Sequence, residues 1–242
     1  NKIFVEPFSL SKPPARKMIA LGMILQTLMA CNYQIIPFLF YRPKFYCDTP
    51  SGVHECHEVD ACMQPTLNYR SDYTFSSIPQ EFNLYCGNKH EEATILTFHM
   101  VGHLFGAICS TLLADLGHYQ HKTLAVLVTA SFISGISCVI GGLSSTTFLL
   151  NVCITFWSLS AEIILNFMNM VPTLFFAPSM AKRIFSIIVI SWSMYATILP
   201  SIIRIHLSWR TLLIWNVGAL HILWVLYVLY NFRELSTLNT EE

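Results

Sequence analysis

One carboxylate lies inside the apolar part of this chain, and two amides follow it at helical spacing. Glu162 is followed by Asn166 and Asn169, so on a helix the three side chains share one face. An ionisable group in apolar surroundings is costly and commonly takes part in ion or substrate binding. The pattern predicts that Glu162 binds a cation or a proton. The alternative is that Glu162 is protonated, or hydrogen-bonded to a neighbouring helix, and serves only to hold the structure together.

Two histidines and several residues of other apolar segments are further candidates for a binding cavity. His99 and His103 are one helical turn apart, so they either relay protons, pair with Glu162 or serve as hydrogen-bonded packing residues. A metal site would need additional ligands, and none is predicted. An aromatic ring can hold an organic cation on its face, although such rings are equally explained by packing. The remaining candidates are Asn32, Trp192 and Tyr195.

Four of the eight cysteines lie in a polar stretch and the other four in apolar runs. The cysteines of the polar stretch are Cys47, Cys56, Cys62 and Cys86. Four cysteines in one such loop favour two disulfides, with three pairings open. Disulfides persist in oxidising compartments, so this loop is expected outside the cytoplasm.

Six apolar stretches must position these side chains. The chain is 54% hydrophobic and only 12% charged, against about 25% charged residues in average soluble proteins. Each stretch is long enough to cross a bilayer as a helix. We therefore predict an all-α integral membrane protein with six transmembrane helices. The predicted crossings are residues 18–40, 93–114, 123–143, 148–176, 184–203 and 212–230.

The charges of the connecting segments predict the orientation. An even number of crossings places the lead, residues 1–17, and the tail, residues 231–242, on one side of the membrane. The loop of residues 41–92 holds eight of the fourteen carboxylates, but long loops count little in the positive-inside rule. The other Lys and Arg residues lie mainly on the side of the two ends. We predict cytoplasmic ends, an extracellular loop braced by disulfides and, most simply, a plasma membrane location.

Composition and motifs exclude several classes of function. The formal net charge is zero, whereas a nucleic-acid partner would require a basic face. The chain carries no P-loop, no Gly-rich nucleotide fingerprint and no nucleophile elbow, so neither an enzyme nor a bound cofactor is predicted. The expected partners are the lipid bilayer, a small organic ion and another membrane protein.

Short motifs in the chain resemble those of the organic cation and organic anion transporters of the major facilitator superfamily. The polar loop ends in Glu-Phe-x-Leu-x-Cys at residues 81–86, and Ser-Trp-Arg-Thr-Leu at residues 208–212 is similar to the family's Asp-Trp-Arg-x-Leu. Gly102 and Gly106 match spaced glycines of the second crossing and form a small-residue face for close helix packing. The resemblance covers the N-terminal six-helix half of a twelve-crossing transporter. It implies that the fourth crossing, with Glu162, lines a central cavity.

The turn after the second crossing departs from the family pattern. Asp115 is retained, but the turn glycine, Gly117, is one place early. His118 and His121 stand where the family has arginines, which leaves Lys122 as the basic residue of this turn. In the family, this aspartate and the arginines form a cytoplasmic charge latch that rearranges during transport. The resemblance therefore implies a remnant of the latch that no longer cycles in the family's way.

Two functions follow from these observations. One is a half-transporter, which binds a small organic ion between its own lobe and a second lobe supplied by another copy or another membrane protein. The other is a transport-inactive structural or auxiliary subunit of a larger membrane complex. The altered latch favours the subunit, whereas the retained Glu162, Asn166 and Asn169 favour binding of an ion.

Overall fold

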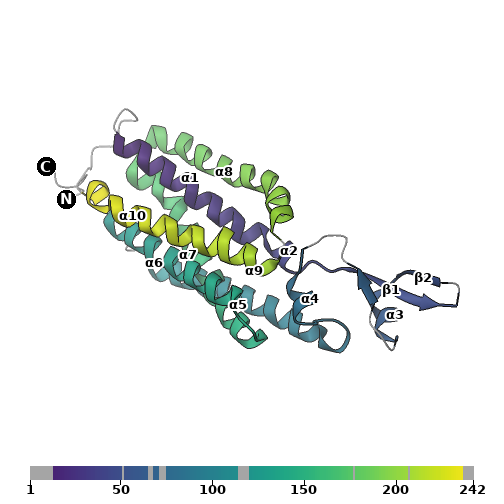
Figure 1. Ribbon diagram of the computed structural model, residues 1–242. Coiled ribbons are helices and arrows are strands. Elements are labelled where there is room, and N and C mark those ends of the chain that lie inside the picture. The colour runs from purple at the N-terminus through teal and green to yellow at the C-terminus, as the bar shows by residue number, and fades with distance from the viewer. Residues whose placement is uncertain are drawn as a thin grey trace.

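Long helices form most of the protein, as Figure 1 shows. The computed structural model describes residues 13–50, 52–64, 68–70, 75–113, 120–176, 178–206 and 208–236. The long helices in these ranges are α1 (Pro13–Gln34), α5 (Lys89–Leu113), α6 (Gln120–Gly142), α7 (Thr147–Phe175), α8 (Pro178–Ile205) and α10 (Leu220–Ser236). They form one bundle, and α1 begins at the end of the bundle at which α10 ends.

Five helical segments of the described residues are long and apolar enough to cross a membrane, so the chain is an integral membrane protein. They are Cys86–Leu113, Lys122–Gly142, Thr147–Phe175, Pro178–Ile205 and Trp209–Asn231. Helices of the required length and apolarity are thus found at the second to the sixth predicted crossing. The helix α1 is not among them, since polar residues such as Arg16, Lys17, Asn32 and Gln34 lie near its two ends. A first crossing, and with it a count of six, stays a prediction.

The first predicted crossing, residues 18–40, is two helices rather than one. After α1 ends at Gln34, a short helix α2 (Ile36–Leu39) begins beyond Ile35. Pro37 lies in the first turn of α2, where its missing N–H costs nothing, although it cannot continue the hydrogen-bond ladder of α1. Along its length α1 packs mainly against α8 and also contacts α7 and α10.

The helix α7 lies in the middle of the bundle, where it packs against α5, α6, α1 and α8. It begins where the Thr146 hydroxyl accepts a hydrogen bond from the N–H of Leu149, which satisfies one of the free donors of the first turn. Large side chains of α7 are fully buried, among them Trp157, Ile164 and Phe167. They belong to the two apolar clusters that form the core along the bundle.

The last predicted crossing contains a π-helical segment. The short helix α9 (Trp209–Thr211) leads into the π-helical η3 (Leu212–Ala219), which continues directly as α10. Gly218 of η3 lies against Gly135 of α6, where an added Cβ would be only 3.1 Å from the Gly135 carbonyl oxygen. The absence of a side chain therefore permits close approach of the last crossing to α6.

The polar loop of residues 41–92 contains a three-stranded antiparallel sheet, which the all-α prediction did not include. The strand β1 (Lys44–Thr49) lies between β2 (Gly52–Cys56) and β3 (Asn68–Arg70). The loop also contains the short helices α3 (Glu58–Cys62), α4 (Ile78–Glu81) and η1 (Cys86–Asn88). The sheet projects from the end of the bundle opposite the start of α1 (Figure 1).

The four cysteines of the loop form two disulfides. Cys47 is joined to Cys56, which links β1 to β2, and Cys62 is joined to Cys86, which links α3 to the segment before α5. The loop is therefore braced as predicted, with the pairing now defined. The free cysteines in the described part of the chain are those of the apolar runs, namely Cys31, Cys109, Cys138 and Cys153.

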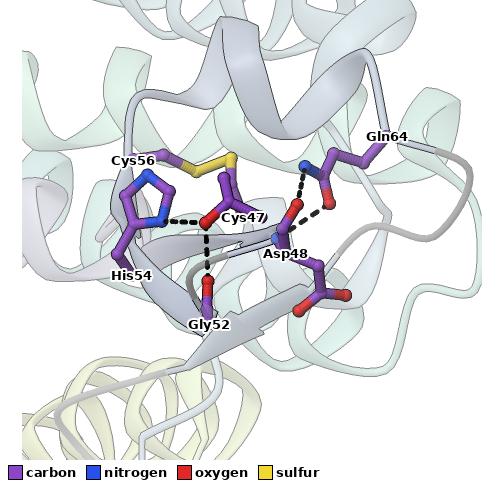
Figure 2. Close-up of a disulfide and its surroundings, with 7 residues drawn as sticks. Cys47, Asp48, Gly52, His54, Cys56 and Gln64 are labelled. Atoms are coloured by element: carbon purple, nitrogen blue, oxygen red, sulfur yellow. Dashed lines mark hydrogen bonds between the residues drawn. A yellow bond between two sulfur atoms is a disulfide. The ribbon is translucent and has the colours of Figure 1, made fainter.

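Polar contacts hold the hairpin and join it to the bundle. The Gln64 side-chain amide donates to the carbonyl oxygen of Asp48 at 3.1 Å and accepts from its N–H at 3.0 Å (Figure 2). At the base of β1, Arg42 donates to Glu58 of α3 at 2.6 Å and also to Glu92 of α5. Arg42 thus connects the small sheet to the first turn of a membrane-spanning helix.

Candidate functional site

Glu162 lies at the centre of a polar cluster inside the helical bundle. Its Oε2 atom accepts a hydrogen bond from the Tyr33 hydroxyl at 2.8 Å and is 3.1 Å from Nδ1 of His103. Its Oε1 atom accepts a hydrogen bond at 3.3 Å from Asn166, whose amide also donates to Ser110. Tyr33 comes from α1, His103 and Ser110 from α5, and Asn166 from α7 itself, so three helices meet at this carboxylate.

Two glycines of α5 allow the close helix approach on which this cluster depends. A Cβ atom at Gly102 would lie 2.5 Å from the carbonyl oxygen of Thr155. At Gly106 it would lie 2.5 Å from the carbonyl oxygen of Leu159 and 2.6 Å from Cβ of Glu162. These distances are too short for any side chain, so the small-residue face predicted for the second crossing is its contact with α7.

Aromatic rings extend the cluster from α5 to α8. The Tyr33 ring stacks on the His103 ring, with centroids 5.1 Å apart, and its centroid is 5.6 Å from that of Trp192 on α8. The side chains of His103 and Glu162 retain 17% and 21% of their exposure, and Tyr33 and Trp192 are half-buried. The carboxylate and the aromatic rings beside it are therefore only partly buried.

A second histidine lies behind this group. The His99 ring packs edge-on against the His103 ring at 4.6 Å between centroids, and His99 Nδ1 is 2.5 Å from Oγ of Ser158. Because the Ser158 hydroxyl donates to the carbonyl oxygen of Ile154 at 2.7 Å, it accepts from His99, which fixes a proton on Nδ1 of His99. His99 therefore supports the position of His103 rather than contacting Glu162 directly.

Three of the predicted cavity residues lie outside the cluster. Asn32 points to α10, where its Nδ2 atom is 3.4 Å from Nε2 of the buried His221. The Tyr195 hydroxyl donates to Sγ of Cys31 at 2.9 Å and is buried between α8 and α1. Asn169 is exposed, one turn beyond Asn166. The residues that the structure brings together are thus the other predicted ones: Glu162, Asn166, His103, Trp192 and, behind them, His99.

Tyr33 is the member of the cluster that the sequence analysis missed. It directly follows Asn32 in the chain, and successive residues of a helix point about 100° apart. The choice between Asn32 and Tyr33 depends on the rotation of α1 against α7, which an amphipathic pattern could have indicated only weakly. The available signal was that a tyrosine, which has both an aromatic ring and a polar hydroxyl, directly follows a predicted cavity residue.

The turn that resembles a transporter latch lies partly outside the described residues. Asp115 and Gly117 lie outside the described residues, and Lys122 lies near the start of α6, partly exposed. Asn151, in the second turn of α7, is buried.

Two stretches that carry the resemblance, residues 81–86 and 208–212, meet at the end of the bundle that carries the small sheet. Glu81 accepts a hydrogen bond from the Trp209 indole N–H at 2.6 Å and another from Nε of Arg210 at 2.6 Å. Arg210 also donates to the carbonyl oxygen of Gly142 at 2.7 Å, at the end of α6. Its guanidinium lies over the Trp209 ring at 4.6 Å and near the Phe82 ring at 5.8 Å. This Glu81–Arg210 clamp joins the end of the polar loop to the start of the last predicted crossing.

The two helices that flank the Glu162 cluster are the least buried of the spanning segments. Only 28% of the most apolar stretch is buried in each of Cys86–Leu113 and Pro178–Ile205, against 44–56% in the other three. α5 and α8 lie on opposite edges of the bundle (Figure 1). Their exposed apolar side chains include Met100 and Leu104 on α5 and Ile190 and Met194 on α8. In the described residues, no group of three or more His, Cys, Asp or Glu side chains is arranged to hold a metal ion.

Comparison with known proteins does not assign the chain to a family. No protein-family model matches it, and no curated protein matches it. The chemistry of the site must therefore be inferred from its own geometry.

Proposed function

We propose that this membrane protein is one lobe of an organic-ion transporter-like carrier and that it binds an organic cation at Glu162. The observation that supports this most strongly is the convergence of Tyr33, His103 and Trp192 on a half-buried carboxylate. A carboxylate beside aromatic faces is the arrangement that recognises ammonium groups, because charge attraction and cation–π attraction act on the same ligand.

The charges of the cluster favour a cation over an anion. Glu162 contributes a carboxylate, and the contacts described above bring no Lys or Arg side chain to it. The other contacts are the Tyr33 hydroxyl, the Asn166 amide and the imidazole of His103. An anionic ligand would have to approach the carboxylate without a Lys or Arg side chain to offset the repulsion between the two negative charges, and this repulsion is strong in a medium of low dielectric constant. Of the two ion classes that the resemblance implies, the cation is therefore the better supported.

The weakly buried helices α5 and α8 support the presence of a second lobe. Both contribute residues to the Glu162 cluster, and both present apolar faces outward. In two-lobed carriers the ligand is bound between the lobes near the middle of the membrane. We propose that a second six-helix lobe, from another copy or another membrane protein, packs against the exposed apolar side chains of both helices, with α1 as the first of six crossings in this lobe.

The proposed setting is the plasma membrane, with the disulfide-braced sheet outside and the start of α1 and the end of α10 in the cytoplasm. Two disulfides in the loop are compatible with an oxidising exterior. The alternative, a transport-inactive subunit of a larger membrane complex, is supported by the altered latch turn. It would use the same exposed faces for assembly but would not need a cation at Glu162.

Equilibrium binding of a radiolabelled quaternary ammonium to membranes containing the full chain tests the proposal. We expect saturable binding by the wild-type protein and a loss of at least about tenfold in affinity in Glu162→Gln, which removes the charge and keeps the shape. Glu55→Gln, in the exposed part of the small sheet, is the matched control and should bind like the wild type. Equal binding by wild type and Glu162→Gln would remove Glu162 from the site. An absence of binding, with co-migration in a large complex on native gels, would instead support the subunit.

A further inference from the structure

We infer that the groove between α1 and α10 binds a sterol, with the hydroxyl of the sterol at Tyr227 and its rings along the apolar wall of α10. The groove has a volume of about 330 Å³ and lies between two helices that contact each other along the bundle (Figure 1). Pockets for small molecules begin at about 300 Å³ and are mostly apolar, with a few polar groups that orient the ligand. The inference goes beyond the proposed function and does not depend on a cation at Glu162.

The walls of the groove are apolar and open towards the lipid. Ile24 comes from α1, and Leu220 and Leu223 come from α10; all three are exposed. The buried Trp224 forms the inner side of the groove, where its indole N–H donates to the carbonyl oxygen of Leu21 at 3.2 Å. A ligand for this groove must therefore be largely apolar and must reach it from the membrane.

Tyr227 supplies the polar group of the groove that is free to bind a ligand. Its side chain is exposed, and within the part of the chain that the structure describes its hydroxyl has no hydrogen-bond partner. The hydroxyl of Thr27, which also lines the groove, already donates to the carbonyl oxygen of Met23 at 2.9 Å. One unbonded hydroxyl in an apolar groove suits a ligand with a single hydroxyl, because each group then gives the other the hydrogen bond that acyl chains cannot provide.

The position of the groove along the membrane also suits a sterol. The apolar segment of the last predicted crossing runs from Trp209 to Asn231, so Leu220 lies at its middle and Tyr227 one turn before its end. The seven residues between these two span about 10 Å of helix, which is less than half of an apolar core about 30 Å thick. Tyrosines are enriched at the edge of that core, where the hydroxyl of a sterol also lies. A compact ring system therefore fits the groove better than an acyl chain does.

The sequence around Tyr227 follows a pattern proposed for contact with cholesterol. In that pattern a Leu or Val, a Tyr and a Lys or Arg follow one another, with one to five residues between neighbours. Leu223, Tyr227 and Arg233 have this spacing. The pattern alone is weak, and Tyr230 also completes it together with Val228. Leu223 and Tyr227 both line the groove, however, whereas Tyr230 does not, so the pattern and the cavity point to the same tyrosine.

The groove and the Glu162 cluster lie on opposite sides of α1. Ile24 of the groove and Tyr33 of the cluster are nine residues apart, and nine steps of about 100° bring a helix to half a turn from its starting direction. A sterol in the groove would contact α1 without reaching the carboxylate. We therefore expect the sterol and the organic cation not to compete for one site.

Photolabelling of the purified full chain in phosphatidylcholine vesicles tests the inference. The probe is a radiolabelled cholesterol that carries a diazirine on its ring system, and the labelled peptides are identified by mapping. We expect saturable labelling of residues 24–28 and 220–227. Excess unlabelled cholesterol should displace the probe, whereas cholestene, which lacks the hydroxyl, should displace it about three- to tenfold less well, the effect of one hydrogen bond.

Two pairs of variants separate this site from general contact with lipid. Leu223→Trp fills the groove and should reduce the labelling at least about tenfold, whereas Leu226→Trp adds the same bulk at a residue that does not line it. Both leucines are exposed, so neither change should disturb the core. Tyr227→Phe removes the hydroxyl and should weaken displacement by cholesterol about three- to tenfold. Tyr230→Phe is its control and should behave like the wild type.

Several results would overturn the inference. Labelling that does not saturate, or that spreads evenly over the exposed faces of α5 and α8, would show only contact with the membrane. Labelling of the groove by a phosphatidylcholine with a diazirine in its acyl chain, without displacement by cholesterol, would assign the groove to phospholipid. Unchanged displacement in Tyr227→Phe would remove the hydroxyl from the site. None of these results affects the binding of a quaternary ammonium, which tests the proposed function separately.

Discussion

Replacement of Gly106 by alanine is a sharp test of the helix contact on which the candidate site depends. The added methyl would lie 2.5 Å from the Leu159 carbonyl oxygen, 2.6 Å from Cβ of Glu162 and 3.1 Å from Cα of Leu159. Two of these three atoms belong to the backbone of α7 and cannot move aside by rotating a side chain. α5 must therefore move away from α7 by about 1 Å to restore ordinary contact.

Overpacking of this kind costs about 1–3 kcal/mol. For a chain of 242 residues, each kcal/mol lowers the melting temperature by roughly 2–4 °C, so a decrease of about 2–12 °C is expected. A shift of that size is measurable by the fluorescence of the buried tryptophans in detergent. Because the 3.1 Å contact between His103 and Glu162 crosses the same interface, affinity for a quaternary ammonium should fall as well.

The matched control is Gly87→Ala, since an added Cβ at Gly87 meets no atom within 4 Å. It should leave both the melting temperature and the affinity unchanged. If Gly106→Ala melts and binds like the wild type, α5 and α7 do not approach as described, and the argument for the Glu162 cluster fails with them.

Three further predictions concern the polar loop and the end of the bundle to which it is joined. Replacement of both cysteines of a disulfide by serine should lower the stability of the loop by about 3.5 kcal/mol for Cys62–Cys86 and about 2.7 kcal/mol for Cys47–Cys56, because the bonds close loops with sequence separations of 24 and 9. The protease concentration needed to cleave the loop measures both losses. Equal resistance to protease after reduction of the disulfides would contradict the prediction. Arg210→Lys keeps the positive charge but removes the planar guanidinium that donates to both the Glu81 carboxylate and the Gly142 carbonyl oxygen. We therefore expect the free energy of unfolding to fall by about 1–2 kcal/mol in melting experiments. An unchanged melting temperature would refute this prediction. Burial lowers the pKa of His206, so protonation of its imidazole opposes folding. The free energy of unfolding should therefore decrease as the pH falls through the pKa that His206 has in the folded state. His206→Gln should flatten this part of the profile of stability against pH, and an unchanged profile would show that another group causes the decrease.

The spanning helices could be predicted from the sequence because apolar length alone specifies them. The second crossing was predicted as residues 93–114 and is found in α5, Lys89–Leu113; the fourth was predicted as 148–176 and is α7, Thr147–Phe175. The small sheet could not be predicted in the same way. Its strands are only three to six residues long and β2 is largely exposed, so no alternating apolar pattern marks them.

The sequence indicated which helices contribute to the candidate site, but not which residues of each helix face it, because that depends on how the helices are rotated about their axes. Asn166 follows Glu162 by one turn and bonds to it, whereas Asn169, a further turn along, is exposed. The two glycines indicated which face of α5 packs closely, but not that this face meets α7 opposite Glu162. The pairing of the disulfides was likewise open, since it depends on the folded positions of Cα atoms 5.8 Å and 5.6 Å apart.

Photoaffinity labelling tests the central claim, a cation site at Glu162, most directly. A quaternary ammonium that carries an aryl azide would be bound to the full chain in its native membrane, activated by light and located by peptide mapping. We predict labelling of the segments around Tyr33, His103 and Trp192, with loss of that labelling in Glu162→Gln. Labels confined to the small sheet, or to the apolar groove between α1 and α10 lined by Ile24, Leu223 and Tyr227, would contradict it.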